Sequence, residues 1–86
     1  MVCKLAKEYV WKEVGGQVVI LHLDSGSYFS LNPTGSLVWK GVMEPVSLDR
    51  IVQRLCSSFQ VDEETSRKDA EEIIQKFLDK EMIVNE

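Results

Sequence analysis

Two short glycine-bearing connections between strand-forming runs constrain the fold of this chain more than any other feature. Gly15-Gly16 separates the run YVWKEV from QVVILHLD, and Ser25-Gly26 separates the second run from SYFSL. Short connections of this kind between β-branched and aromatic runs are typical of a hairpin meander. The sequence therefore predicts three antiparallel strands over residues 9–14, 17–24 and 27–31, with the second strand paired on both sides.

A turn at Ser25-Gly26 also predicts which residues pair across the second hairpin. The predicted pairs are Leu23 with Tyr28, His22 with Phe29, and Ile20 with Leu31. One face of the sheet then carries Val18, Ile20, His22, Phe29 and Leu31, and the other carries Val19, Leu21, Leu23, Tyr28 and Ser30. Because a sheet this small lays only one face on its own helices, the second apolar face, or the edge beside it, is predicted to meet an outside partner.

Capping residues and apolar periodicity predict three helices in the rest of the chain. Asn32 before Pro33 starts the first helix, which Pro45 ends, while Ser47 and Asp62 cap the second and third. The predicted core positions are Leu37, Val38, Trp39 and Val42, then Leu48, Ile51, Val52, Leu55, Cys56 and Phe59, then Ala70, Ile73, Ile74, Phe77 and Leu78. The predicted fold class is therefore α+β: a three-stranded antiparallel β-meander followed by three helices, winged-helix-like in order, in a single domain over residues 1–86.

Residues able to support catalysis are scarce. The one histidine, His22, lies in an apolar strand with no Asp, Glu or Cys at a spacing suited to acid–base chemistry or metal binding, so a structural role is predicted. Gly15-Gly16 lacks the strand-to-helix context of a phosphate loop. Cys3 and Cys56 lie in unlike settings with no secretory signal pattern before them, which predicts reduced thiols in the cytoplasm. We expect a monomer without enzymatic activity, metal or cofactor.

Charge argues against nucleic acids and anionic membrane surfaces as partners. The net charge is −4, and residues 62–81 hold eight acidic against four basic side chains. A nucleic-acid-binding helix would carry Lys or Arg against phosphates, so this helix predicts repulsion. Part of its charge is predicted to form i,i+4 pairs, namely Glu63–Arg67, Glu64–Lys68 and Glu72–Lys76. A winged-helix-like regulator or scaffold binding another protein or DNA remains the alternative interpretation.

Several motifs in fixed order resemble a known family. They are the aromatic strand ending in LN, the PTG helix start and the VW within that helix, as they stand in GSYFSLNPTGSLVW. An I-V-x-x-L second helix and a D-A-x-x-I third helix follow. Together they cover most of the chain and resemble the PqqD family, the peptide chaperones also called precursor-peptide recognition elements. One departure is that relatives often place a glycine before the final apolar pair, where this chain has Glu81 and Met82 before Ile83.

The resemblance implies a binding function. PqqD-like proteins bind the leader region of a ribosomally made precursor peptide and present it to a processing enzyme, such as a leader peptidase, cyclase or radical enzyme. In relatives the leader adds as a strand beside the third strand and the third helix. The matching positions here are Tyr28, Phe29, Ser30 and Leu31 on the strand, and Asp69, Ile73 and Lys76 on the helix. The amino-acid sequence of the central motif, YFSLNPTGSLVW, is more similar to the lasso-peptide type of the family than to the PQQ type.

The residues themselves favour the same strand. SYFSL contains no Lys, Pro or internal charge, the devices that normally protect an edge strand from pairing with another chain. We therefore expect its backbone to pair with an added peptide, while pockets beside the helix select apolar or aromatic side chains. Asp69 is expected to meet a basic residue of that peptide.

Overall fold

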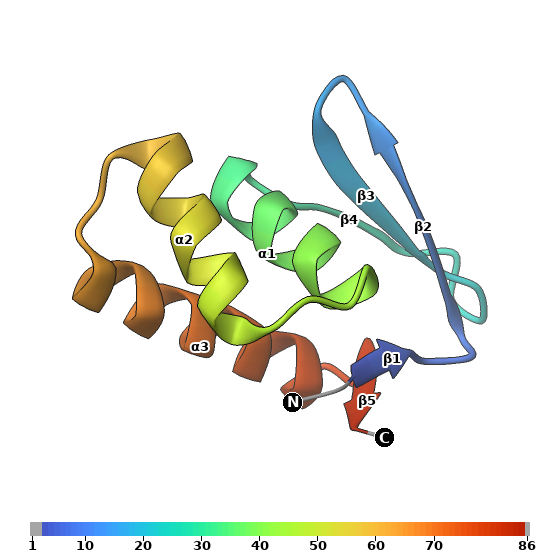
Figure 1. Ribbon diagram of the computed structural model, residues 1–86. Coiled ribbons are helices and arrows are strands. Elements are labelled where there is room, and N and C mark those ends of the chain that lie inside the picture. The colour runs from blue at the N-terminus through green and yellow to red at the C-terminus, as the bar shows by residue number, and fades with distance from the viewer. Residues whose placement is uncertain (1–2, 86) are drawn as a thin grey trace.

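The computed structural model describes residues 3–85 and places their helices and strands in two connected layers (Figure 1). The elements are β1 (Cys3–Leu5), β2 (Tyr9–Val14), β3 (Gln17–His22), β4 (Tyr28–Ser30), α1 (Pro33–Met43), α2 (Leu48–Phe59), α3 (Glu63–Asp79) and β5 (Ile83–Asn85). Strands β2, β3 and β4 form an antiparallel sheet in that order. The α+β prediction is confirmed, whereas the arrangement does not establish the winged-helix likeness. The predicted domain also includes residues 1–2 and 86, which lie outside the described residues.

A second, two-stranded sheet was not predicted. β1 pairs antiparallel with β5, with Cys3 opposite Asn85 and Leu5 opposite Ile83, so the two ends of the described chain lie side by side (Figure 1). Each strand has three residues and no turn connects them, so neither carries a hairpin signal in the sequence. Cys3 is buried at this junction, and desolvation raises the pKa of its thiol.

The register of the second hairpin differs from the predicted one by two residues. Ile20 lies opposite Phe29 and Leu21 opposite Tyr28, rather than Ile20 opposite Leu31. The cause is a wider loop, closed by hydrogen bonds from the His22 N–H to the Ser27 oxygen (2.8 Å) and from the Gly26 N–H to the His22 oxygen (2.9 Å). A shift of two residues keeps every side chain on its predicted face, because strand side chains alternate with period two.

The two faces of the sheet have opposite surroundings. Val18 and Ile20 on the inner face are fully buried against the helices. The outer face leaves exposed Val10, Val14, Leu21, Leu23 and Tyr28. The prediction of a second, uncovered apolar face is therefore confirmed for the described residues.

Helix α1 lies between the sheet and α2, and α3 runs beneath α1 and α2 toward β1 and β5 (Figure 1). Its Trp39 is completely buried and meets Trp11 and Phe77 edge to face, with ring centroids 6.2 and 5.0 Å apart. Such aromatic pairs add to the stabilisation from burial alone. Trp39 thereby joins the sheet to α3, as its predicted core position requires.

The three predicted caps are confirmed. The side chains of Asn32, Ser47 and Asp62 each accept a hydrogen bond from the backbone N–H three residues ahead.

Most predicted core positions are buried or half-buried. The exception is Phe59, which is 37% exposed because it ends α2 just before Gln60, whose left-handed conformation turns the chain away. Cys56 is half-buried, with its Sγ 3.5 Å from the Ser66 hydroxyl.

The predicted ion pairs on α3 form only in part. Arg67 contacts Glu63 at 3.5 Å and, more closely, Asp49 of α2 at 2.7 Å. The predicted pairs Glu64–Lys68 and Glu72–Lys76 do not form, since no ion pair joins them within residues 3–85. Exposed i,i+4 pairs contribute only a few tenths of a kcal/mol, so side-chain entropy readily leaves them open.

Candidate functional site

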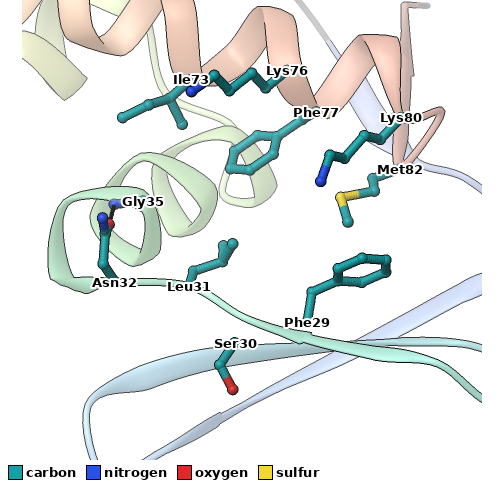
Figure 2. Close-up of a pocket in the computed structure, with 10 residues that line it drawn as sticks. All are labelled: Phe29, Ser30, Leu31, Asn32, Gly35, Ile73, Lys76, Phe77, Lys80 and Met82. Carbon is teal, nitrogen blue, oxygen red and sulfur yellow. Dashed lines mark hydrogen bonds between the residues drawn. The ribbon is translucent and has the colours of Figure 1, made fainter.

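A groove runs between β4 and the C-terminal half of α3, with a volume of about 290 Å³. We refer to it as the β4–α3 groove. Its lining residues are Phe29, Ser30, Leu31, Asn32, Gly35, Ile73, Lys76, Phe77, Lys80 and Met82, all drawn in Figure 2. They come from the strand, the start of α1, the helix and the turn after it.

The interior of the groove is apolar. Phe77 and Met82 form its floor and are only 5% and 2% exposed. Phe29, Leu31 and Ile73 remain half-buried, so part of each side chain faces the open groove. Figure 2 shows Phe29 and Leu31 on the side of the strand that faces α3, while Ser30 points away. The groove can therefore accept an apolar side chain from a segment lying along β4.

The backbone of β4 offers a free edge beside this groove. The bonds from Leu31 N–H to the Val18 oxygen (2.9 Å) and from His22 N–H to the Ser27 oxygen (2.8 Å) show which residues face β3. Because alternate residues of an antiparallel strand direct their N–H and C=O to opposite sides, those of Tyr28 and Ser30 point outward. No described strand pairs with that side.

Ser36 holds the end of this edge in place. Its buried hydroxyl accepts a hydrogen bond from the Val18 N–H (2.9 Å) and donates one to the Leu31 oxygen (3.2 Å). The hydroxyl thus stands between the last residues of the β3–β4 ladder, where the chain leaves the sheet for α1. This corner positions Asn32 and Gly35 at one end of the groove.

Gly35 leaves room at this corner. Its N–H donates to the Asn32 Oδ1 at 2.7 Å, and an added Cβ would lie only 3.1 Å from that same oxygen. The absence of a side chain lets the cap form closely against the groove wall.

The predicted site residues divide into three groups. Phe29, Ser30, Leu31, Ile73 and Lys76 all line the β4–α3 groove. Tyr28 borders it through its backbone, but its side chain is 71% exposed on the outer face of the sheet. Asp69 does not line the groove: it lies one turn before Ile73 and borders a small separate pocket with Thr34 and Ser66.

Five lining residues were not among the predicted ones: Asn32, Gly35, Phe77, Lys80 and Met82. Helical spacing carries a signal for two of them, since Phe77 and Lys80 continue the row of Ile73 and Lys76 along one face of α3. Met82 follows the helix and reaches the groove only because the chain turns sharply at Glu81, which has φ +58°.

The described residues contain little that points to chemistry at the groove or elsewhere. His22 bonds to the Ser25 hydroxyl through Nδ1 (2.7 Å) and its ring lies 4.8 Å from that of Tyr9, consistent with a structural role. Residues 3–85 contain no group of three or more metal-ligating side chains. No helix in this part of the chain is long and apolar enough to span a bilayer.

Comparison with known proteins gives a consistent result. A family model described as coenzyme PQQ synthesis protein D (PqqD) matches residues 17–83. The solved structure of TbiB1 in complex with the TbiA(beta) leader peptide is 29% identical, with a TM-score of 0.84 over 96% of each chain. Lasso peptide synthetase B1 complexed with the leader peptide shares the fold at 21% identity and a TM-score of 0.88, covering 99% of this chain and 100% of that one. No curated protein matches the sequence significantly.

Proposed function

This chain belongs to the coenzyme PQQ synthesis protein D (PqqD) family, and from that premise we propose that it binds the leader of a ribosomally made precursor peptide. The leader adds as a strand to the free edge of β4 and places apolar side chains in the β4–α3 groove. The protein then presents the bound peptide to a processing enzyme, such as a leader peptidase or a radical enzyme, and itself catalyses no reaction. It acts in the cytoplasm, as a monomer when alone.

The observation that carries this proposal is the outward-facing backbone of Tyr28 and Ser30 beside an apolar groove. Two N–H and two C=O groups can form up to four hydrogen bonds with an added strand. The alternate side chains of that strand would face the groove, as Phe29 and Leu31 do. Backbone bonds then contribute affinity and the groove contributes selection, as in other cases of β-strand addition.

Magnitudes support a binding site of moderate affinity. Four bonds at about 0.5–1.5 kcal/mol each and one or two buried anchors at about 1.5–3 kcal/mol each give about 3.5–12 kcal/mol, from which ordering a flexible peptide takes roughly 2–5 kcal/mol. The surplus is at most about 10 kcal/mol, so the dissociation constant is no lower than about 50 nM, and the loss of rigid-body freedom raises it further. Binding of this strength lets the protein release the peptide to an enzyme.

The pathway we propose is of the lasso-peptide type. The support is TbiB1, which is 29% identical over 96% of each chain and was solved with a leader peptide. A leader peptidase and a cyclase are then the enzymes expected to receive the bound precursor.

A proline at Ser30 tests the strand-addition proposal. Ser30→Pro removes one outward N–H without breaking a bond to β3, because the Ser30 N–H points away from that strand. We expect leader affinity to fall at least about tenfold, while Ser30→Ala, which keeps the N–H, binds normally. Calorimetry would use synthetic N-terminal segments of short open reading frames encoded beside this chain.

Two results would contradict the proposal. Equal affinity for the proline and alanine variants would exclude pairing at this edge. Absence of binding by every such segment to the unchanged protein would count against leader recognition itself. Circular dichroism melting checks that both variants remain folded.

A further inference from the structure

Two lysine side chains stand on the α3 rim of the β4–α3 groove. Lys76 and Lys80 lie one helical turn apart, both exposed, and the Lys80 Nζ is 5.3 Å from the centroid of the Phe29 ring (Figure 2). Among residues 3–85 neither ammonium has a carboxylate oxygen within 4.0 Å. The groove lining includes no Asp or Glu. This part of the surface is therefore cationic.

The local charge is opposite in sign to that of the molecule, which carries a net charge of −4. No acidic group of α3 lines the groove, and three of them have other neighbours: Glu63 contacts Arg67, Asp79 accepts from Gln75, and Asp69 borders another pocket. Because the predicted pair with Glu72 does not form, the Lys76 ammonium is available to a bound chain. A general attraction to basic partners, which the overall charge suggests, does not apply at this groove.

Spacing relates the two lysines to an added strand. Residues four apart on a helix have Cβ atoms about 5–6 Å apart. Residues two apart on a strand face the same side about 6.6 Å apart. The distance between successive inward side chains of a leader lying along β4 is therefore nearly the distance between the Cβ atoms of Lys76 and Lys80 on α3.

We propose that the groove selects leaders in which Asp or Glu lies two residues from an apolar anchor. The anchor packs over Phe77 and Met82, and the carboxylate meets Lys76 or Lys80 on the rim. Lys or Arg at that leader position is repelled. This inference rests on the proposed leader binding and names the class of leader that the site accepts.

The two lysines are expected to act on selectivity more than on affinity. Exposed ion pairs are screened by water and salt and are individually weak, whereas a like charge placed opposite is disfavoured. Charge complementarity at a rim also speeds association and excludes wrong partners. Discrimination between an acidic and a basic leader is thus the quantity to measure.

A displayed library of random 12-residue peptides tests the inference without a known leader. Peptides retained by the unchanged protein are expected to carry Asp or Glu two residues from an apolar residue more often than the input library. A Lys76→Glu, Lys80→Glu double variant is expected to select Lys or Arg there instead. Lys7→Glu with Lys68→Glu is the matched control, because it makes the same charge change at two exposed lysines outside the groove.

A selected acidic peptide gives a second measurement. Its affinity for the unchanged protein is expected to fall severalfold between about 50 and 500 mM salt, and to change little for a Lys76→Gln, Lys80→Gln variant.

The outcomes separate this inference from the proposed function. Retained peptides without charge preference, or with the same preference in the groove variant as in the control, would overturn the inference and leave leader binding standing. If the unchanged protein retains no peptide above background, the proposed function fails and the inference fails with it.

Discussion

Glu81 shows how one residue connects α3 to the groove. The Glu81 N–H bonds to the Leu78 oxygen and the Met82 N–H to the Phe77 oxygen, both at 3.0 Å. This pattern is a Schellman motif, whose residue of positive φ is usually glycine. Glu81 occupies that position with φ +58°, and it directs Met82 back onto Phe77. The groove floor therefore depends on a turn that the sequence does not mark with a glycine.

Glycine at this position is expected to stabilise the protein. A side chain in the left-handed region costs about 1–2 kcal/mol, and part of that gain is lost to the greater unfolded-state entropy of glycine. Glu81→Gly should raise the free energy of unfolding by about 0.5–1 kcal/mol in urea titrations. Glu81→Ala is the control, since it removes the charge and keeps the Cβ. An equal gain from alanine would attribute the effect to charge.

At the scale of elements, α1 has to approach three neighbours at once. It packs on β3 through Ser36, on α3 through Trp39, and on α2 where Gly41 faces Ile51. A Cβ at Gly41 would lie 2.6 Å from the Ile51 Cγ1, closer than real contacts allow. The glycine thus sets how closely the two helices pack.

Alanine at Gly41 is expected to destabilise the protein despite its better helix propensity. The new methyl group would push α2 away or force Ile51, which is 2% exposed, from its packed position. We expect a loss of about 1–3 kcal/mol in the free energy of unfolding, measured by urea denaturation. Ser57→Ala, at an exposed position of α2, controls for helix propensity and should change stability by less than about 0.5 kcal/mol. A stabilised Gly41→Ala protein would show that the helices separate freely.

Two carboxylates at helix ends predict how stability depends on pH. The Thr65 N–H lowers the pKa of Asp62 at the start of α3, and a two-point hydrogen bond from Arg54 (2.8 and 3.0 Å) lowers the pKa of Glu44 after α1. Their stabilisation is complete above the unfolded-state pKa values. It is lost as pH falls through the lower values of the folded state.

The midpoint of thermal unfolding should therefore fall as the solution is acidified below about pH 4. A variant with Asp62→Asn and Glu44→Gln should show a smaller fall, because asparagine still caps the helix but neither group titrates. If the variant and the unchanged protein lose stability in parallel, other carboxylates cause the acid sensitivity.

Considered as a whole, the molecule separates its surfaces by charge and polarity. The β4–α3 groove with its two lysines lies beside the free edge of β4. The exposed residues Val10, Leu21 and Tyr28 lie next to one another in one row across the outer face of the sheet. The remaining surface carries the excess of acidic groups that gives the net charge of −4. Two lysines on one rim are too few to overcome the electrostatic repulsion between this net negative charge and a polyanion.

Duplex DNA is therefore expected not to bind. Affinity for DNA comes largely from cations that neutralise phosphates, and α3 with its following turn carries four more acids than bases over residues 62–81. No shift of a labelled 30-base-pair duplex is expected in gel retardation at physiological salt with about 50 µM protein. Tight, salt-sensitive retardation would favour the winged-helix alternative.

The sequence by itself determined the parts that depend on neighbours along the chain. Caps at Asn32, Ser47 and Asp62, the three helices, the three-stranded meander and the face of each strand residue all follow from local hydrogen bonding and periodicity. The strand side of the candidate groove was predicted from the unprotected edge SYFSL and from the resemblance to the PqqD family, and Ile73 and Lys76 on the helix were implied by that resemblance.

Only the tertiary structure decided the rest. The β1–β5 sheet, the meeting of Met82 with β4 in the groove and the exclusion of Asp69 from it depend on residues far apart in sequence. The two-residue change in register comes from the width of the loop that the His22–Ser27 hydrogen bond closes, which the turn signal does not specify. Such contacts are selected by the packing of the whole core, since loop width and helix position adjust together to bury Trp39 and its neighbours. A local pattern specifies which face a side chain occupies, but not which distant residue it meets there.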